Sequence, residues 1–276
     1  MAYKVEIFSE MIQCNFSTHP PPNSLHIHDL LEILFFLDGD VNFFIDGNSW
    51  LLERGTMLFI EKNLIHGPRI LSNKEYVRST IHFSKDLAME LSTNEIDLLA
   101  PFNNGIRKIQ IPEIFIPNME VLLYSLTNEY LKPSEVGHEL LLKTYLTQVL
   151  IYAQNITDTT EDRNEQFLSK LINDTLEFIQ DNLANTNLSL EFIAESLSYN
   201  SIYLNRQFKN EVGNTIHQYI IICRISYAKK LLESGLDVQT SCDKCGFNNY
   251  SNFIRVFKKI SGTTPKKYSL TFKNND

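Results

Sequence analysis

Two arginines recur in the last third of the chain within the same pattern of neighbours. A shift of 49 residues places Arg206 on Arg255. The same shift superposes further pairs, namely Asn200 on Asn249, Leu204 on Phe253, Phe208 on Phe257, Lys209 on Lys258, Gly213 on Gly262, Thr215 on Thr264 and Tyr219 on Tyr268. A guanidinium can bond a guanine edge through two hydrogen bonds at once, and a side-chain amide can do the same for adenine. The repeat therefore predicts two units that read the base pairs of a duplex.

The neighbours of each arginine predict the elements that hold it. Each unit reads as a helix, a turn and a second helix, and Asn200 and Asn249 stand where their side chains can cap the second helix. Apolar side chains four residues apart share one face of that helix, which leaves Arg206 and Arg255 pointing outward. This is the layout of a helix-turn-helix unit, whose second helix lies in the major groove of DNA. A helical repeat with no role in DNA binding is the alternative.

The distribution of charge favours a nucleic-acid partner, although the whole chain carries a net charge of −8. Residues 1–199 hold 13 Lys and Arg against 28 Asp and Glu, whereas residues 200–276 hold 12 against 5. A basic region on an acidic chain suits phosphate binding, because cations near the backbone release condensed counterions. On charge alone, an ordinary solvated surface is the alternative.

The C-terminal sequence resembles the AraC-type transcription regulators over roughly residues 167–270. The string G-F-x5-F-x-R-x-F-K-K-x-x-G-x-T-P-x-x-Y, here Gly246 to Tyr268, is among the most specific signatures of that family. The resemblance implies seven helices, with two recognition helices joined by a long one near Ile216–Leu232. The chain departs from the family pattern at Ser241, where an apolar residue is usual, and at Ser269, where Arg is common.

The resemblance also implies which side chains contact an operator. Base contacts fall to Ile202, Asn205 and Arg206 in the first unit and to Tyr250, Ser251 and Arg255 in the second. Phosphate contacts fall to Lys209, Lys258, Lys259 and the backbone amides around Asn249. Double-stranded operator DNA is then the main partner, and RNA polymerase is a further one.

Cys242 and Cys245 form a C-x-x-C pair, which could be a redox pair or half of a metal site. The repeat, with a shift of 48 residues at this point, places them on Ala194 and Leu197, which are core positions. A zinc site would need two more ligands, and residues 167–276 contain no second C-x-x-C and no H-x3-H. We therefore expect two buried thiols.

The N-terminal part predicts short strands separated by turns. The expected strands are Leu31–Leu37, Val41–Ile45, Trp50–Leu52, Thr56–Ile60 and Val77–Phe83. Asp46-Gly47 between two apolar segments is a strong hairpin signal. Short strands at this spacing favour a small barrel or sandwich.

Two motifs in this region resemble those of the cupins. His26, His28, Glu32 and Gly39 fit H-x-H-x3-E-x6-G, and Gly55 precedes His66 at the spacing of the second motif, with Glu61 and Asn63 in place of Pro and Gly. The resemblance implies a divalent metal at His26, His28, Glu32 and His66. AraC-type sensors often keep cupin remnants while they bind a small organic effector or nothing, so a metal, an effector pocket and a polar patch all remain open. Phe35 and Phe43 are further pocket candidates, whose strand faces the sequence leaves open.

Two amphipathic helices are expected after the strands, at Met119–Leu131 and Glu135–Gln154, with Ser134 as a cap between them. Their apolar seam is longer than one barrel face requires. The resemblance to the AraC-type regulators implies a homodimer through such helices, and the seam permits it. The alternative is that the seam only covers the barrel. The polar stretch that follows is expected to be a linker.

The expected architecture is mixed and has two domains. Residues 1–155 form a cupin-like β-barrel with two following helices, 156–166 a linker, and 167–276 an all-α domain with two helix-turn-helix units. We expect a DNA-binding transcription regulator, not an enzyme, that dimerises and senses a small effector. A metal-dependent cupin enzyme with an accessory helical domain is the alternative. Neither a membrane-spanning run nor a signal peptide is recognisable, so a cytoplasmic location is expected.

Overall fold

The computed structural model describes residues 12–19, 25–103, 106–132, 136–156 and 168–273. A sheet-rich N-terminal domain is followed by an all-helical C-terminal domain. The predicted linker, residues 156–166, and the predicted cap Ser134 lie outside the described residues, except for Ile156. Among the residues described, none of the helices combines the length and apolar character needed to span a bilayer.

The N-terminal domain is built from two antiparallel sheets. The strands are β1 (Ile12–Ser17), β2 (Leu31–Asp38), β3 (Val41–Ile45), β4 (Asn48–Leu51), β5 (Thr56–Ile60), β6 (His66–Ile70), β7 (Val77–Phe83) and β8 (Ile106–Gln110). The larger sheet has the order β1-β7-β2-β5-β8, and the smaller one has the order β4-β3-β6. All five expected strands are present, and β1, β6 and β8 were not anticipated.

Strand β2 is buried from Leu31 to Leu37, and mostly apolar apart from Glu32, because the larger sheet is covered on both faces. Leu34 and Phe36 belong to the apolar core shared with the smaller sheet, whereas Ile33 and Phe35 belong to the core shared with the following helices. This alternation is the two-residue period of a strand. The β3–β4 hairpin turns at Asp46-Gly47, as predicted, and both residues have positive φ angles of 44° and 96°.

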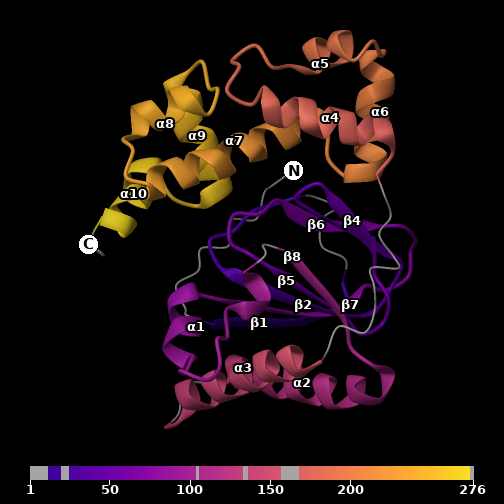
Figure 1. Ribbon diagram of the computed structural model, residues 1–276, viewed down its shortest axis with the longest axis vertical. Coiled ribbons are helices and arrows are strands. Elements are labelled where there is room, and N and C mark those ends of the chain that lie inside the picture. The colour runs from indigo at the N-terminus through magenta and orange to yellow at the C-terminus, as the bar shows by residue number, and fades with distance from the viewer. Residues whose placement is uncertain (1–11, 20–24, 104–105, 133–135, 157–167, 274–276) are drawn as a thin grey trace.

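Helices close the other face of the larger sheet. They are α1 (Lys85–Leu91), α2 (Ile116–Leu131) and α3 (His138–Asn155), with short 3-10 turns at Ala100–Phe102 and Glu113–Phe115. Helix α2 begins three residues before its predicted start at Met119, and helix α3 begins three residues after its predicted start at Glu135. Gly137, with a φ of 89°, directly precedes α3. The smaller sheet lies on the opposite side of the sandwich from α2 and α3, facing the helical domain (Figure 1).

The C-terminal domain contains the seven helices that the resemblance implied. They are α4 (Lys170–Asp181), α5 (Leu190–Ser196), α6 (Ser201–Val212), α7 (Ile216–Glu233), α8 (Val238–Lys244), α9 (Tyr250–Ser261) and α10 (Pro265–Lys273). The long helix α7 passes from the first helix-turn-helix unit to the second. A capping box between Thr215 and Gln218 fixes its start.

The two domains share an apolar core. Leu25, Ile27, Phe44 and Ile65 of the N-terminal domain belong to the same cluster as the core of the helical domain. The ring of Phe44 stands edge-on to that of Tyr219 on α7, with their centroids 6.1 Å apart. The outer face of the smaller sheet therefore docks on the helical domain.

Candidate functional site

Helices α6 and α9 are capped as the repeat predicted. The side-chain oxygen of Asn200 accepts a hydrogen bond from the backbone N of Tyr203 at 3.1 Å, and that of Asn249 accepts one from the N of Asn252 at 2.8 Å. Each helix ends at a glycine in the left-handed region. The apolar pairs of both helices are fully buried, namely Leu204 with Phe208 and Phe253 with Phe257. The two units are thus built alike.

The outward face of α6 carries three of the four residues expected to contact DNA from this helix. Ile202 is 77% exposed, and Arg206 and Lys209 are also exposed. The guanidinium of Arg206 lies 5.8 Å from the ring centroid of Tyr203, a cation–π contact along the same helix. This face presents one large apolar side chain and two cations to solvent.

The outward face of α9 carries the second set. Asn249, Tyr250, Ser251, Arg255, Lys258 and Lys259 are all exposed. Nη2 of Arg255 donates to the side-chain oxygen of Asn252 at 2.8 Å, one helical turn earlier. That contact holds the guanidinium close to the surface of the helix.

Asn205, for which the family resemblance implied a base contact, also has a partner within the protein. Its side-chain oxygen accepts a hydrogen bond from the backbone N of Ile216 at 3.0 Å. Reading adenine requires that same oxygen and the amide nitrogen together. In this arrangement Asn205 ties α6 to the first turn of α7.

The C-x-x-C pair is buried, as expected for core residues. Cys242 and Cys245 are both free thiols, and Cys245 Sγ donates to the backbone O of Cys242 at 3.3 Å. Burial raises the pKa of Cys242 to about 11 and that of Cys245 to about 12, so both thiols stay protonated near neutral pH. The hydroxyl of neighbouring Ser241 is satisfied by the carbonyl of Asp237 at 2.8 Å, which explains how a polar residue is tolerated there.

The four cupin-like residues do come together. We call His26, His28, Glu32 and His66 the histidine cluster; one ligand atom from each lies within 4.8 Å of all the others. His26 and His66 face each other across an isolated antiparallel bridge between their backbones. Glu32 is on β2 and His66 begins β6. His26 is exposed, and the other three are buried.

Glu32 is the centre of the cluster. Its Oε2 lies 2.8 Å from His28 Nε2, 3.0 Å from His66 Nε2 and 3.5 Å from His82 Nε2. Burial by itself would raise the pKa of Glu32, but attraction to His82 and the contacts from His28 and His66 hold it well below its ordinary value. The carboxylate is therefore ionised at neutral pH.

The structure also places His82, Phe43 and Phe35 relative to the cluster. His82 was missed by the sequence analysis because no local motif marks it; it reaches Glu32 because the two residues are register partners in the β2–β7 pairing. Phe43 lies as expected, with its ring stacked 6.3 Å from that of His66. Phe35, the other pocket candidate whose strand face the sequence left open, packs on the helix side of the larger sheet.

An open groove of about 600 Å³ lies elsewhere on the N-terminal domain. It is lined by Phe16, Leu37, Asp38, Arg54, Val77, Glu120, Val121 and Tyr124, and so borders helix α2. None of the predicted effector-binding residues lines it. The groove and the histidine cluster are therefore separate features.

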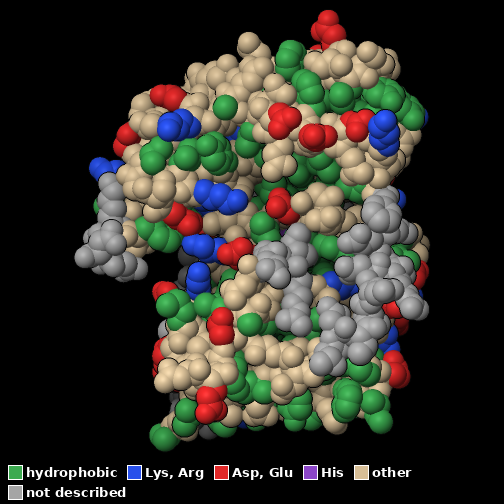
Figure 2. Space-filling view, viewed as in Figure 1, with side chains coloured by type: hydrophobic (Ala, Val, Ile, Leu, Met, Phe, Trp, Pro, Cys, Tyr) green, Lys and Arg blue, Asp and Glu red, His purple; other side chains and the backbone are tan. Residues whose placement is uncertain are grey.

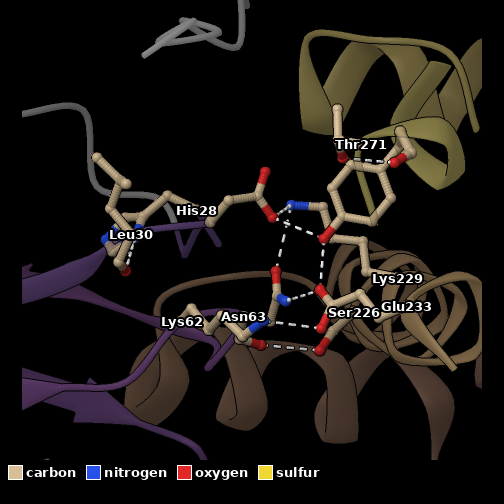
Figure 3. A network of polar contacts seen from close by, with 10 residues as sticks. His28, Leu30, Lys62, Asn63, Ser226, Lys229, Glu233 and Thr271 are labelled. Carbon is tan, nitrogen blue, oxygen red and sulfur yellow. Dashed lines mark hydrogen bonds and ion pairs between the residues drawn. The ribbon is translucent and has the colours of Figure 1, made fainter. Parts of the chain in front are cut away.

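Polar contacts join the cluster's flanking segments to the helical domain (Figure 3). We call this set the interdomain network; its members are Asp29, Lys62, Asn63, Ser226, Lys229, Glu233 and Tyr268. The ammonium of Lys229, only 1% exposed, donates to Asp29 at 2.7 Å and to the side chain of Asn63 at 3.2 Å. Ser226 donates to the backbone O of Asn63 at 2.8 Å.

Two further residues complete the interdomain network. Glu233 accepts from the side chain of Asn63 at 3.0 Å and from Lys62 at 2.8 Å. The hydroxyl of Tyr268 lies 2.9 Å from Asp29 and 2.6 Å from Glu233.

Comparisons with known proteins agree with this architecture. The AraC-like ligand binding domain family matches residues 19–150, and a helix-turn-helix domain family matches residues 181–270. The uncharacterized transcriptional regulatory protein YesN of Bacillus subtilis is 34% identical over 119 residues, which cover 42% of this chain and 32% of YesN. The chain thus spans about a third of the length of that relative.

Two further similarities complete the comparison. The multiple antibiotic resistance protein MarA of Escherichia coli is 35% identical over 101 residues, which cover 36% of this chain and 79% of MarA. A crystal structure of ToxT from Vibrio cholerae aligns over 95% of this chain and 98% of that one, but with 17% identity and a TM-score of 0.38 it supports no argument about function. YesN is described as a transcriptional regulatory protein, and the two matching families are a helix-turn-helix domain and an AraC-like ligand binding domain, so the comparisons favour the regulator over the cupin enzyme. The chain belongs to the AraC family of transcription regulators.

Proposed function

We propose that the protein regulates transcription by binding operator DNA through α6 and α9 in successive major grooves. The observation that carries the proposal is the pair of matched, capped helices with exposed Arg206 and Arg255. They are joined by α7, whose 18 residues correspond to a length of roughly 27 Å. That length is comparable with the ~34 Å that separate successive major grooves on one face of a duplex.

The side chains that contact DNA follow from exposure and chemistry. We assign base contacts to Ile202, Arg206, Tyr250, Ser251 and Arg255. We assign phosphate contacts to Lys209, Lys258, Lys259 and the first amides of α9 after Asn249. Asn205 is given the different task of positioning α7 against α6, because its oxygen is already bonded there.

Footprinting with the full chain tests this proposal. On DNA upstream of neighbouring genes, we expect two protected patches on one face of the duplex, about one turn apart. Arg206→Ala should weaken one patch and Arg255→Ala the other, whereas Lys170→Ala, which removes an exposed cation from α4, should leave both unchanged. Loss of both patches to the same degree in either arginine variant would contradict separate reading by two units.

We also propose that the chain dimerises through α2 and α3. Apolar side chains are exposed along these helices, among them Val121, Tyr124, Leu131, Leu140 and Tyr152. Figure 2 shows hydrophobic side chains along the edge of the molecule that these helices form. A single exposed apolar side chain needs no partner, but several of them along two neighbouring helices suit an interface.

Sedimentation velocity tests the dimer. Leu140→Glu should convert a dimer into a monomer, because a buried charge without a partner is costly at an interface. Met89→Glu, at an exposed apolar position on α1, is the matched control and should leave the dimer intact. A wild-type chain that sediments as a monomer at micromolar concentration would refute the proposal.

We propose that the histidine cluster is the site where the protein senses its effector. The cluster has buried polar groups that converge on the carboxylate of Glu32, whereas none of the residues predicted to bind an effector lines the open groove beside α2. A regulator that occupies promoter DNA lies beside RNA polymerase, which we propose as a further partner. We also propose a cytoplasmic location, because that is where the operator DNA of a bacterial regulator lies.

A further inference from the structure

Arg224 lies at the centre of α7 and is buried, although its side chain carries a permanent charge. It is only 7% exposed. Its Nε donates to the backbone O of Leu183 at 3.2 Å, and its Nη2 donates to the backbone O of Asn185 at 2.7 Å. A buried cation needs acceptors that compensate for the lost water, and these two carbonyl groups supply them. Arg224 is too deeply buried to reach DNA, so its charge has a different task.

The two carbonyl groups belong to the loop between α4 and α5, beside the first helix-turn-helix unit. Helix α4 ends at Asp181, α5 begins at Leu190, and α4 packs on both α5 and α6. The loop leaves the C-terminal end of α4, where the helix dipole favours a cation. Because one planar guanidinium bonds both carbonyl groups, it fixes the orientation of the loop as well as its distance from α7.

The second unit reaches the same loop through the turn between α8 and α9. Gly246 in this turn has a φ of +82°, and an added Cβ would collide with the backbone O of Leu183 and lie 3.0 Å from Nε of Arg224. The two units therefore meet here backbone against backbone, which only glycine permits. Phe247 follows, with its ring centroid 5.8 Å from Cζ of Arg224 and 5.2 Å from the ring centroid of Phe253 on α9. Arg224 thus connects the loop after α4 with the buried face of α9.

We propose that Arg224 and Gly246 lock the two helix-turn-helix units in one relative orientation, and that this makes the spacing of the two half-sites part of what the protein recognises. The inference rests on the proposed binding of DNA through α6 and α9. We call Leu183, Arg224 and Gly246 the inter-unit clamp. Arg224 is in this sense a positioning residue, because it acts on DNA only through the helices that it holds.

The length of α7 alone does not fix the orientation of the units. A helix sets the distance between its ends, but a unit attached at one point can still rotate about the helix axis. Here the first unit is attached at two points, because Asn205 on α6 bonds the N of Ile216 at the start of α7 and Arg224 bonds the loop at its centre. Helices α8, α9 and α10 pack on the same helix (Figure 1). Rotation of one unit against the other must therefore break the clamp.

The geometry of a duplex makes such a clamp selective for spacing. One added base pair moves the second half-site by about 3.4 Å along the duplex and by about 35° around it. Two linked binding modules gain affinity from each other only if both can engage at once. Rigidly held units therefore lose the second contact when a base pair is inserted, whereas loosely joined units would follow the half-site.

Fluorescence anisotropy with the full chain and three duplexes measures this effect. The duplexes are the operator found by footprinting, the same operator with one base pair inserted between the half-sites, and a duplex that keeps only the half-site read by α6. In the wild type the insertion should weaken binding at least about tenfold, because linked modules gain ~10²–10⁴-fold when both engage.

Arg224→Met should reduce this penalty to about threefold or less, because its second unit can follow the displaced half-site. It should bind the single half-site as the wild type does, which shows that α6 is folded. Lys230→Met, which removes an exposed cation from the same helix, is the matched control and should keep the full penalty. A penalty in Arg224→Met equal to that of the wild type would overturn the clamp.

Gly246→Ala tests the clamp without removing a charge, and it decides the question if Arg224→Met does not fold. Gly235, in the turn between α7 and α8, offers the matched control. Its φ of +88° imposes similar backbone strain on alanine, but an added Cβ there meets nothing within 4 Å. Gly246→Ala should lose the spacing penalty, and Gly235→Ala should keep it. The same penalty in both variants, whether kept or lost, would overturn the clamp.

A distance measurement tests the clamp without DNA. Spin labels on Asn210→Cys in α6 and Lys258→Cys in α9, both exposed positions, report the separation of the two helices by pulsed electron paramagnetic resonance. The chain without introduced cysteines is the labelling control. We expect one narrow distance distribution in the wild-type background and in Gly235→Ala, and a broad one in Gly246→Ala. A narrow and unchanged distribution in Gly246→Ala would overturn the clamp.

These outcomes separate the clamp from the proposed function. A wild type that binds no operator would overturn the reading of DNA and with it the role of the clamp in spacing, while the label distances would still decide whether the clamp exists. Operator binding that an inserted base pair leaves unchanged would keep the regulator and overturn the selection of spacing.

Discussion

The variant Arg255→Ala tests whether α9 contacts bases through Arg255 and phosphates through its lysines. The side chain is exposed and its one described partner is Asn252 on the same helix, so its removal opens no cavity. Loss of a bidentate contact to a base should cost about 1–3 kcal/mol, which corresponds to a roughly 5- to 150-fold weaker Kd on the operator. On an operator already mutated at the contacted base pair, the same variant should show little further loss.

Fluorescence anisotropy with the operator and single-base variants measures this difference. Lys258→Ala, three residues further along the exposed face of α9, is the comparison. It should weaken binding to every sequence alike and reduce the slope of log K against log salt by about one unit. The reasoning is refuted if Arg255→Ala weakens all sequences equally, or if its thermal unfolding shows that the helix itself has been lost.

Three further variants test the structural framework. Asn249→Ala removes the cap of α9 and should lower the free energy of unfolding by about 0.5–2 kcal/mol in chemical denaturation. Gly55→Ala should be more harmful than a typical surface change, because Gly55 has a φ of +85° and an added Cβ would lie 2.7 Å from Ile116 Cδ1; an unchanged melting temperature would contradict this. Oxidants should change the DNA affinity of Cys242→Ala and of the wild type to the same extent, because both thiols of the C-x-x-C pair are buried and protonated near neutral pH. A DNA affinity that depends on the thiols would instead favour the redox pair.

The helix-turn-helix units could be predicted because their determinants are local. A capping Asn, apolar side chains four residues apart and a terminal glycine all lie within one helix and its flanks. Asn205 shows the limit of this reasoning. Nothing in the sequence indicates that its oxygen bonds the start of the next helix, eleven residues away, and so is engaged within the protein.

Strand β6 was missed for a clear physical reason. Its sequence, His66-Gly67-Pro68-Arg69-Ile70, contains the two residues that most often end a strand. Among the described strands, β3 is the one neighbour of β6, which lies at the edge of the smaller sheet. Apart from the bridge between His66 and His26, β6 has no ladder on its outer side within the described residues, so the proline interrupts none there. Edge position is a property of the assembled sheet and cannot be read from the segment alone.

The candidate site was only partly visible in the sequence. The cluster's four members carry recognisable spacing, but His82 joins Glu32 through strand register across fifty residues. The burial of Lys229 is still harder to predict, because the sequence gives no sign that a lysine on this long helix is not a surface residue. It is buried where the two domains meet, and its ammonium donates there to Asp29, two hundred residues earlier.

The salt dependence of operator binding by the full chain tests the central claim most directly. Each phosphate neutralised contributes about −0.9 to the slope of log K against log salt concentration. The three lysines assigned to phosphates, Lys209, Lys258 and Lys259, therefore predict a slope of about −3 or steeper. A slope near zero, or no attraction for double-stranded DNA at low salt, would contradict an account in which α6 and α9 enter the grooves of a duplex.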